Sequence, residues 1–393
     1  MEMKVSEILE NNLSGEWGEE CIDTTGTKVI RTTNFTNDGT LNLSKIVLRK
    51  IAPNKLEQKK LKYGDTIIEK SGGSPSQPVG RVVFFDEKNE TFLCNNFTNL
   101  LRVKKDIVDC KYFFYFMFYN HLSSKTLSFQ NKTTGIINLK LESYLTKTKI
   151  PLPPIEEQEK IASILDKVDA LRQKRKESIK LLDNFLKSTF LDMFGDPVKN
   201  EKGWPTIPMN KIGHFLSGGT PSKSRSDYWE GIYPWVSPKD MKQDFINEAQ
   251  DHISEKVFKE SSLKKIAPGH LLLVVRGMIL AHSVPTAVNT VPVSINQDMK
   301  AILPTKEISV IFLKRCFDSM KNKILSIITT ASHGTKKFET DAMKKILIPT
   351  PPLSLQNQFV GFEEKVQTQK RLLAVSRDEL DNLFNALMQK YFG

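Results

Sequence analysis

The sequence contains few of the residues that build metal centres or disulfide frameworks. Its 393 residues include four cysteines, at positions 21, 94, 110 and 316, with no C-x-x-C pair, and six dispersed histidines. This pattern disfavours a zinc site and a disulfide framework, and it suits a reducing cytoplasm. No apolar run approaches the ~18 residues that a membrane-spanning helix needs. The start, MEMKVSEILENN, is acidic and polar, unlike a signal peptide.

Motifs of nucleotide and methyl-transfer chemistry are also missing. We find no P-loop of the form G-x-x-x-x-G-K-[ST]. The segments LPPI and TPPL are not the Asn/Asp-Pro-Pro-aromatic motif of a methyltransferase. We therefore expect this chain to contain no catalytic residue, no metal and no cofactor.

Positive charge is in excess, and it is unevenly distributed. The chain has 57 Lys and Arg against 45 Asp and Glu, a net charge of +12. Residues 155–193 and 353–390 are each balanced between cations and anions, so the excess lies in the two remaining blocks. A basic excess confined to globular blocks favours a polyanionic partner, with nucleic acid first among the candidates. The alternative is a basic protein that binds no nucleic acid.

A long internal repeat determines the predicted architecture. The stretch IPLPPIEEQEKIASILDKVDALR begins at Ile150, and IPTPPLSLQNQ begins 198 residues later at Ile348. At the same offset, Gln158 matches Gln356 and the dipeptide Phe-Gly at 194–195 matches the one at 392–393. Repeats of this kind decide the architecture before local propensity is considered. The chain is predicted to be built as block, helix, block, helix.

Each repeat copy is predicted to form one long helix. Prolines stand at its entrance, where a missing N–H costs nothing, and Gly195 is a stop signal. About 39 residues give a helix roughly 58 Å long. The apolar residues alternate three and four apart, which predicts a seam between the two helices. The residues expected at this helix-pair or partner interface are Ile161, Ile164, Val168, Leu171, Leu182, Phe185, Phe359, Phe362, Val366, Leu373, Leu380 and Leu383.

The two blocks resemble each other faintly. LKYGDTIIEK at 61–70 is similar to IAPGHLLLVVR at 266–276, a glycine turn followed by an apolar strand. CNNFTNLLRV at 94–103 is similar to INQDMKAILP at 295–304, and QNKTTGIINL at 130–139 to TTASHGTKKF at 329–338. GGSPS at Gly72 and GGTPS at Gly218 occupy different places in their blocks and are not equivalents. The aromatic run YFFYFMFYNHL at 112–122 is expected in the core.

The doubled helix motif, with VIRTTNF…GD in the first block and GGTPS…YPWVSPKDM…INQDM in the second, resembles the specificity subunit of type I restriction–modification enzymes. The resemblance covers essentially the whole chain. It implies a mixed α/β fold with two pseudo-repeated target-recognition domains, at 1–150 and 196–348. These would be separated by long antiparallel helices, at 151–195 and 349–393. One departure is the absence of an acidic pair like Glu156–Glu157 from the second copy.

The resemblance also implies partners. Each domain would read one half of a split site in double-stranded DNA, while the helices set the gap and dock two methyltransferase subunits. Restriction subunits would join that assembly. S-adenosylmethionine would bind in the methyltransferase subunits, and the complex would act in the cytoplasm without a membrane.

Candidate DNA contacts are basic residues beside flexible turns, together with polar and glycine residues of the same motifs. The full set is Thr32, Asn34, Lys70, Gly72, Gly73, Arg81, Lys132, Thr133, Gly219, Thr220, Lys223, Ser237, Lys239, Arg276, Lys336 and Lys337. Two other functions stay open. One is a fused modification enzyme with an unrecognised active site, and the other is a non-catalytic RNA-binding or coiled-coil adaptor.

Overall fold

The computed structural model describes residues 1–21, 25–74, 76–133, 136–331 and 334–393, and of Lys132 and Thr133 it describes only the backbone. The chain divides into two compact units. Unit 1 consists of Met1–Lys176 and Ala374–Gly393, and unit 2 of Glu177–Leu373. Each unit contains one globular domain and part of each long helix. The predicted mixed α/β chain with two repeated domains and two long helices is confirmed.

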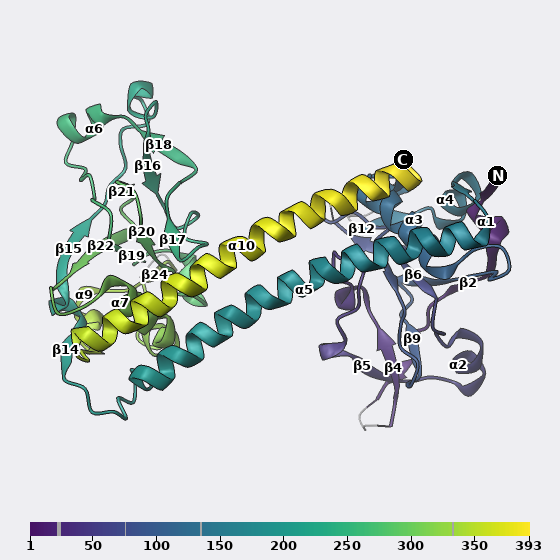
Figure 1. Ribbon diagram of the computed structural model, residues 1–393, viewed down its shortest axis with the longest axis horizontal. Coiled ribbons are helices and arrows are strands. Elements are labelled where there is room, and N and C mark those ends of the chain that lie inside the picture. Colours follow the sequence, from purple (N-terminus) through teal and green to yellow (C-terminus); the bar gives the residue numbers. More distant parts are fainter. Residues whose placement is uncertain (22–24, 75, 134–135, 332–333) are drawn as a thin grey trace. The chain divides into compact units, whose positions relative to one another are not determined.

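The long helices are α5 (Ile155–Phe194) and α10 (Leu353–Phe392), each of 40 residues (Figure 1). Two prolines precede each helix, at 153–154 and 351–352, where the first turn has no use for the missing N–H. Helix α5 ends at Gly195, which has a φ of +77°, a conformation that glycine adopts without steric cost. The expected helix segments began four residues earlier, but residues 149–151 and 347–349 are strands.

The two helices pair in an antiparallel sense within each unit. In unit 1, Arg172 forms an ion pair with Asp381, and the Arg175 Nε donates a hydrogen bond of 3.2 Å to the Ser376 Oγ. In unit 2, Lys370 forms an ion pair with Asp183. The rings of Phe185 and Phe362 lie with centroids 5.4 Å apart. As residue numbers rise along α5, those of the partners fall along α10.

Burial along the helices does not follow one continuous apolar seam. The expected seam residues that are buried lie in the outer turns of each helix: Ile161, Val168, Phe359 and Val366. Those that are partly buried are Ile164, Leu182, Phe362, Leu373 and Leu380. Three are exposed, namely Leu171 (44%), Phe185 (54%) and Leu383 (46%). The outer turns pack into the cores of the domains, so those cores decide which residues are buried.

Unit 1 is built around a four-stranded antiparallel sheet of order β2-β10-β6-β8. A second sheet has the order β3-β5-β4-β9, and the hairpin β11–β12 pairs with β7. The strands are β1 (Glu2–Lys4), β2 (Leu9–Ser14), β3 (Glu19–Glu20), β4 (Thr27–Ile30), β5 (Val47–Lys50), β6 (Thr66–Glu69), β7 (Ser71–Gly73), β8 (Val82–Phe84), β9 (Phe92–Cys94), β10 (Thr98–Val103), β11 (Gln130–Thr133), β12 (Ile136–Leu139) and β13 (Lys149–Pro151). The helices are α1 (Val5–Ile8), α2 (Pro53–Lys59), α3 (Cys110–Leu122) and α4 (Leu141–Lys147).

Unit 2 repeats this plan with a five-stranded sheet of order β15-β22-β19-β20-β17, a small sheet β18-β16-β21, and the hairpin β23–β24. Its strands are β14 (Thr206–Pro208), β15 (Gly213–Ser217), β16 (Tyr233–Val236), β17 (Phe245–Ile246), β18 (Asp251–Ile253), β19 (Leu271–Val274), β20 (Thr286–Asn289), β21 (Ser294–Ile295), β22 (Met299–Pro304), β23 (Thr329–Thr330), β24 (Lys336–Lys337) and β25 (Leu347–Pro349). Its helices are α6 (Glu255–Glu260), α7 (Val310–Ser319), α8 (Lys321–Leu325) and α9 (Thr340–Met343).

The faint repeat between the blocks corresponds to equivalent strands. The pair β6–β10 in unit 1 matches β19–β22 in unit 2, and the hairpin β11–β12 matches β23–β24. A Cβ at Gly15 or at Gly218 would clash with backbone oxygens of residues 94–95 or 295–296. Gly218 therefore corresponds to Gly15 and not to Gly72, as the sequence comparison indicated.

The aromatic run forms α3 and is buried from Tyr112 to Asn120, which confirms its predicted place in the core. It joins one apolar cluster with the start of α5 and the end of α10, through residues that include Leu165, Phe384 and Phe392. The first domain is thus attached to its helix segments by aromatic and aliphatic packing.

A buried glutamine also attaches the first domain to α5. Gln158 is 1% exposed. Its Oε1 accepts a hydrogen bond of 3.1 Å from the backbone N–H of Asp109, the residue before α3. Its Nε2 donates to the carbonyl oxygens of Pro153 (2.9 Å) and Ile107 (3.3 Å). One side chain therefore joins the proline entrance of the long helix to the start of the domain helix.

Gln356 repeats this arrangement in unit 2, where it is fully buried. Its Oε1 accepts from the backbone N–H of Ser309 (2.8 Å), the residue before α7. Its Nε2 donates to the carbonyl oxygens of Pro351 (2.8 Å) and Glu307 (2.9 Å). The spacing of proline and glutamine in the repeated motif is therefore explained by this contact.

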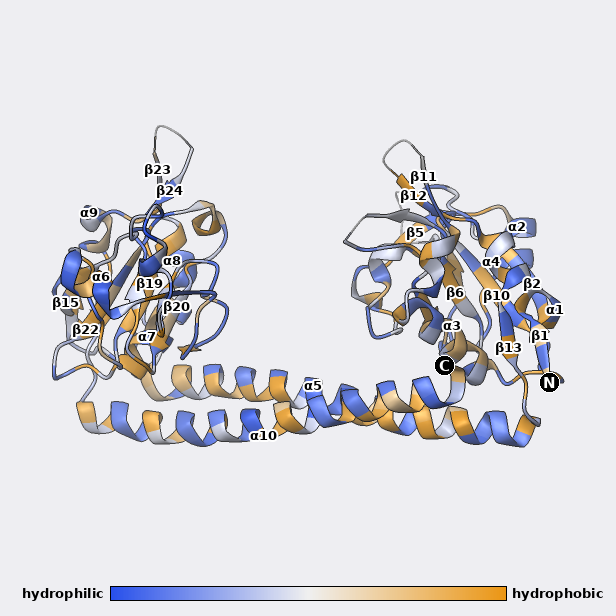
Figure 2. Ribbon diagram, turned by 90° about the horizontal axis from the view of Figure 1, so that it is seen from above, coloured by the Kyte–Doolittle hydropathy of each residue, from blue (hydrophilic) through white to orange (hydrophobic). Residues whose placement is uncertain are grey.

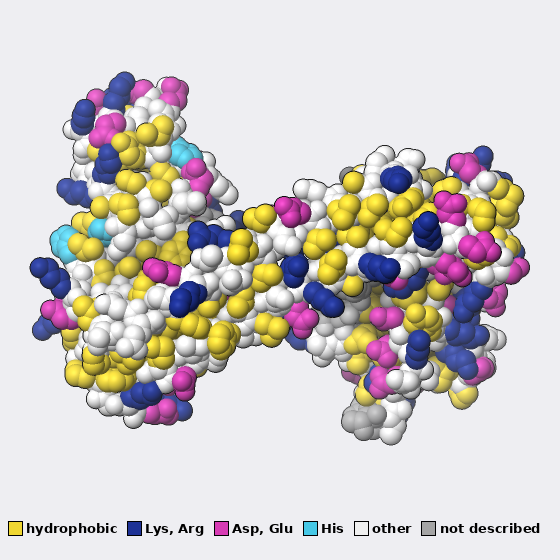
Figure 3. Space-filling view, viewed as in Figure 1, with side chains coloured by type: hydrophobic (Ala, Val, Ile, Leu, Met, Phe, Trp, Pro, Cys, Tyr) yellow, Lys and Arg dark blue, Asp and Glu magenta, His cyan; other side chains and the backbone are white. Residues whose placement is uncertain are grey.

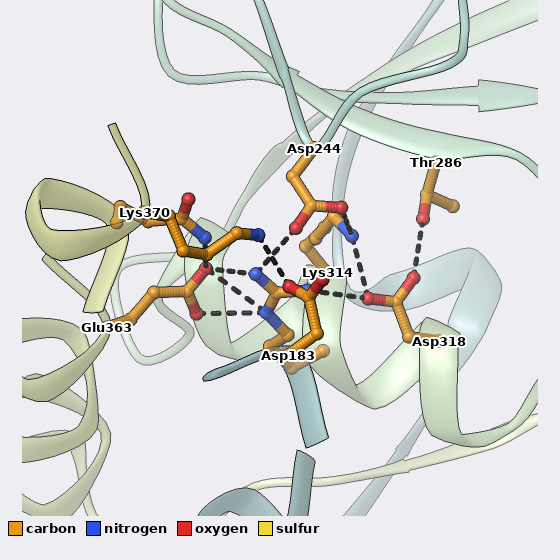
Figure 4. Close-up of polar contacts among 9 residues, drawn as sticks. Asp183, Asp244, Thr286, Lys314, Asp318, Glu363 and Lys370 are labelled. Atoms are coloured by element: carbon orange, nitrogen blue, oxygen red, sulfur yellow. Dashed lines mark hydrogen bonds and ion pairs between the residues drawn. The ribbon is translucent and has the colours of Figure 1, made fainter. Parts of the chain in front are cut away.

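Unit 2 adds a network of charged side chains between α7 and α10, in which Lys314 and Glu363 are buried (Figure 4). The guanidinium of Arg315 forms ion pairs with Glu363, which is 2% exposed, and with Asp244 and Asp318. The Nζ of Lys314 lies 2.7 Å from Asp318 and also contacts Asp244. Burial alone would raise the pKa of the Asp244 carboxyl, but Lys314 and Arg315 hold that pKa at about 2.

Candidate nucleic-acid interface

A polar cleft of about 290 Å³ opens in unit 2 where three turns meet. The turns follow β15, β19 and β21, and the hairpin β23–β24 adds one wall. Figure 2 shows this hairpin at the end of the domain away from the long helices, and the hairpin of unit 1 takes the same place in its own domain. The side chains that line the cleft include Ser217, Arg276, Gln297, Lys300, Lys337 and Glu339.

The backbone around Arg276 is held on two sides. Its N–H donates to the carbonyl oxygen of Asp298 (3.1 Å), and the residue forms an isolated β-bridge with Lys337. The next residue, Gly277, has a φ of +130° and donates its N–H to the carbonyl oxygen of Lys336 (3.0 Å). A side chain would be strained at that φ, so glycine lets the chain turn while it stays bonded to the hairpin.

Hydrogen bonds orient several cleft side chains. The hydroxyl of Thr220 donates to the Oε1 of Gln297. The Nζ of Lys300 donates to the Ser217 Oγ at 3.3 Å. These residues come from strand ends far apart in sequence, which the sheet order brings together.

The two hairpin lysines differ in charge balance. The Nζ of Lys336 donates to the hydroxyl of Thr330 (2.8 Å), so its charge has a neutral partner. Lys337 forms an ion pair with Glu339 at 2.9 Å, which offsets its charge. Of these two predicted residues, Lys336 has the more available charge.

The other predicted residues of unit 2 lie beside the small sheet. The carbonyl oxygen of Gly219 accepts from the indole N–H of Trp235 (2.9 Å). Ser237 is buried and donates to Asp240, and Lys239 forms an ion pair with Asp251. Lys223 is exposed. The Ser237 hydroxyl is thus engaged in stabilising its own turn.

Unit 1 has amide side chains at the equivalent strand positions, of which Asn99 is buried (7% exposed). The Nδ2 of Asn99 donates to the Oδ1 of Asn12 (2.7 Å), and the Ser71 hydroxyl donates to the Oδ1 of Asn138 (2.6 Å). The Nζ of Lys70 donates to the Ser14 Oγ at 2.6 Å. Burial lowers the pKa of the Lys70 ammonium, which therefore lies partly out of solvent.

Two predicted residues of unit 1 have their polar groups engaged inside the domain. Arg81 is 9% exposed and forms hydrogen bonds of 2.8 and 2.9 Å with both carboxylate oxygens of Glu69. Its Nη2 also donates to the carbonyl oxygen of Thr32 (3.1 Å). Asn34 is buried and donates to the carbonyl oxygen of Asn42 (2.9 Å). A position beside a turn does not reveal such partners, because they come from other strands.

Four more predicted residues of unit 1 lie around the hairpin β11–β12. Gly72 has a φ of +99°, and a Cβ at Gly73 would come within 2.7 Å of the Val79 side chain. Gly73 therefore lets the end of β7 pass close to residues 77–79. Lys132 and Thr133 lie in β11, and their side chains are outside the described atoms.

Sequence reasoning missed Ser217, Gln297 and Lys300 in unit 2, and Asn12 and Asn99 in unit 1. A usable signal was the segment CNNF at 94–97 against INQD at 295–298, because both precede an interior strand of the main sheet. The strand order that places them beside the glycine turns was not readable from the sequence.

The long helices expose apolar side chains among charged ones. In unit 1 these are Leu171, Val375 and Leu383, and in unit 2 they are Leu181, Phe185, Leu353 and Leu372. Figure 3 shows hydrophobic side chains on the visible surface of α10. Within the described part of the chain, no helix is long and apolar enough to cross a membrane. Among those same residues, no group of three or more His, Cys, Asp or Glu could hold a metal ion.

Known proteins support this description. A family model described as type I restriction modification DNA specificity domain matches residues 1–181 and 201–380. The type I restriction enzyme EcoR124I/EcoR124II specificity subunit of Escherichia coli is 30% identical over 269 residues, 66% of this chain and 63% of that protein. The MjaIX specificity subunit of Methanocaldococcus jannaschii is 28% identical over 183 residues, 44% of this chain and 41% of that protein.

The matches therefore span less than two thirds of these two relatives. Among solved structures, the S subunit of a type I restriction-modification system from M. genitalium has a TM-score of 0.63 at 14% identity. The alignment covers 100% of this chain and 96% of that one, which shows a shared fold.

Proposed function

Since this chain belongs to the type I restriction modification DNA specificity family, we propose that it is the target-recognition subunit of a type I restriction–modification complex, itself without a catalytic site. Each domain would read one half of a bipartite site in double-stranded DNA. The observation that carries this proposal is the repeated polar surface. Both domains place a hairpin, a glycine turn and a strand-end serine–lysine contact together at the end away from the long helices.

The two halves of the target are expected to differ in sequence. Unit 2 presents Arg276, Gln297 and Lys300, whereas the equivalent strand positions of unit 1 carry Ser71, Asn96 and Asn99. Arginine and lysine favour the O6 and N7 of guanine, whereas asparagine and glutamine favour adenine and serine contacts either, so Arg276 at the position of Ser71 and Lys300 at the position of Asn99 distinguish the two units. The two domains thus share a fold but place different side chains at the proposed DNA-binding surface.

Partners complete the proposal. Two methyltransferase subunits would dock on the exposed apolar residues of α5 and α10, one on the helix segments of each unit, and restriction subunits would bind the resulting complex. S-adenosylmethionine would bind in the methyltransferase subunits. We propose that the complex acts on cytoplasmic DNA.

The long helices would set the distance between half-sites. One heptad inserted into α5 keeps the apolar repeat and adds about 10 Å of helix. This length corresponds to roughly three base pairs. We expect sequencing of methylated DNA to show both half-sites unchanged and a longer spacer. Altered bases in a half-site with an unchanged spacer would contradict this role for the helices.

One experiment separates this function from the two alternatives. The purified full chain, with and without its methyltransferase subunits, is tested for binding to duplex DNA and to RNA and for methyl transfer from S-adenosylmethionine. We expect bipartite duplex binding, and methylation only with the subunits present. Methylation by the chain alone would indicate a fused enzyme, and preferential RNA binding would indicate an adaptor.

A further inference from the structure

We propose, on the basis of the function above, that Arg276 and Gln297 contact base edges in the half-site read by unit 2, while Lys300 and Lys336 contact phosphates. The proposal assigns separate roles to residues that line or border one cleft. The roles are assigned by comparing two kinds of side chain. Some already bond to groups within the protein, and others are held in place but have hydrogen-bond donors that no protein group uses.

Arg276 differs from every other arginine of the chain. The other ten each have a side-chain hydrogen bond or ion pair within the protein, for example Arg81 with Glu69 and Arg315 with Glu363. Among the residues that the structure describes, none pairs with the exposed side chain of Arg276. Its backbone is nevertheless fixed by Asp298 and by the β-bridge to Lys337. A fixed backbone with five free N–H donors suits bidentate contact with the O6 and N7 of guanine.

Gln297 is exposed, but its amide is oriented. The hydroxyl of Thr220 donates to its Oε1, and within the described ranges no group accepts a hydrogen bond from its Nε2. The neighbouring residue Asn296 is buried, so the base of the turn is held within the domain. An amide with free donors on a fixed turn can contact the acceptor atoms of a purine edge. Thr220 would then be a positioning residue for Gln297.

The lysines suit the other role. Lys300 and Lys336 each donate to one hydroxyl group, a neutral contact that a phosphate oxygen can replace. Lys337 is already paired with Glu339, so it offers less charge to DNA. Phosphate contacts position a protein on the duplex without reading its sequence.

The experiment uses the full chain in complex with its methyltransferase subunits and a pool of duplex oligonucleotides with randomised half-sites. Bound sequences and salt dependence are measured for the wild-type chain, R276A, R276K, Q297A, T220V, K300A, K336A and K337A. Thermal unfolding of each variant verifies the fold, and the conservative R276K shows whether bidentate geometry or charge alone matters.

We expect R276A to lower the preference at one position of a single half-site by about 10- to 100-fold, with the other half-site and the spacer unchanged. R276K should recover little of this preference. Q297A should relax a different position of the same half-site, and T220V should have a smaller effect there. K300A and K336A should weaken binding to all sequences by similar factors. Each should also lower the slope of log affinity against log salt concentration by about one, and K337A should have a smaller effect on both.

Two results would overturn the assignment. One is a uniform loss of affinity in R276A and Q297A with the selected sequences unchanged. The other is altered sequence preference in K300A or K336A. If the wild-type complex selects no duplex sequence at all, the proposed function itself fails, and that outcome is recognised before any variant is tested.

Discussion

In each unit a domain is attached to segments of the two long helices. The residues at equivalent positions of the two attachments differ in chemistry. On α5, Leu165 packs into the apolar core of unit 1. On α10, the residue 198 positions later is Glu363, which is buried against Arg315 in unit 2. The position of Arg315 in α7 corresponds to Tyr115 in α3, whose hydroxyl donates to Asp166 at 2.6 Å. The glutamine contact is the same in both, and so is a ring contact between the domain helix and the end of a long helix, Tyr112 with Phe392 and Phe312 with Phe194.

This difference teaches that the two units keep the glutamine and helix-end aromatic contacts while the middle of the junction has diverged. A buried ion pair contributes little over well-packed apolar residues, but it is costly to break because one partner is left uncompensated. Unit 2 should therefore be sensitive to single substitutions at this junction and tolerant of a paired replacement. Unit 1 should show the opposite pattern.

The largest expected effect comes from breaking the charge network. Glu363→Leu removes the buried carboxylate that faces the partly buried Arg315, which keeps Asp244 and Asp318, and should destabilise unit 2 by about 3 kcal/mol. Glu363→Leu combined with Arg315→Tyr, the residues of unit 1, should recover much of that loss. Hydrogen exchange followed by mass spectrometry measures each unit separately. If the double variant is no more stable than Glu363→Leu, the difference between the units is not one of charge compensation.

The shared glutamine provides the next test. Gln158→Ala and Gln356→Ala each leave a buried backbone N–H and two carbonyl oxygens without their partner. Each substitution should cost about 1–3 kcal/mol, because unsatisfied buried groups lose their hydration as well as their bond. Hydrogen exchange of α3 and α7 gives the two values. We expect them to agree closely, and a large inequality would show that one unit does not depend on this contact.

Acid should affect the two junctions differently. The pKa of Asp244 is lowered to about 2, so its ionised form stabilises unit 2 above the ordinary carboxyl pKa near 4, and that stabilisation is lost as the pH falls toward 2. Wild type should therefore exceed Asp244→Asn by about 1–2 kcal/mol at pH 6, and the gap should close between about pH 4 and pH 2. Urea unfolding followed by tryptophan fluorescence measures it. Leu165 has no charge, so Leu165→Ala provides a control whose cost should not vary with pH.

The smallest effect on stability is expected at the exposed helix residues. Leu383→Ser in unit 1 and Leu181→Ser in unit 2 should each change the free energy of unfolding by no more than about 0.5 kcal/mol. Each should instead weaken the binding of one methyltransferase subunit. Analytical ultracentrifugation of the complex measures the stoichiometry. Both variants retaining two tightly bound subunits would exclude these side chains from the docking surface.

The strongest sequence signals concerned local, repeated features. Helices α5 and α10 could be predicted from local signals alone. These are the prolines, the glutamine at fixed spacing, Gly195, and about forty residues without a helix breaker apart from one glycine at 361. The aromatic run was correctly placed in the core. The seam was predicted less well, because periodicity identifies a face of a helix but not the surface that covers it. Phe185 and Leu186 are neighbours, and the second, not the first, is buried in the domain core.

What the sequence by itself determined was therefore the plan: two related domains, each followed by a long helix, and a basic excess in the domains. The tertiary structure decided which polar residues are free to act. Arg81 and Arg276 both stand beside a glycine turn, and their sequence contexts are alike. The β-strand that carries Glu69 lies against Arg81, whereas the described surroundings of Arg276 include no acidic partner for its guanidinium. Ion pairing depends on neighbours from distant parts of the chain, and only the sheet topology determines which neighbours those are.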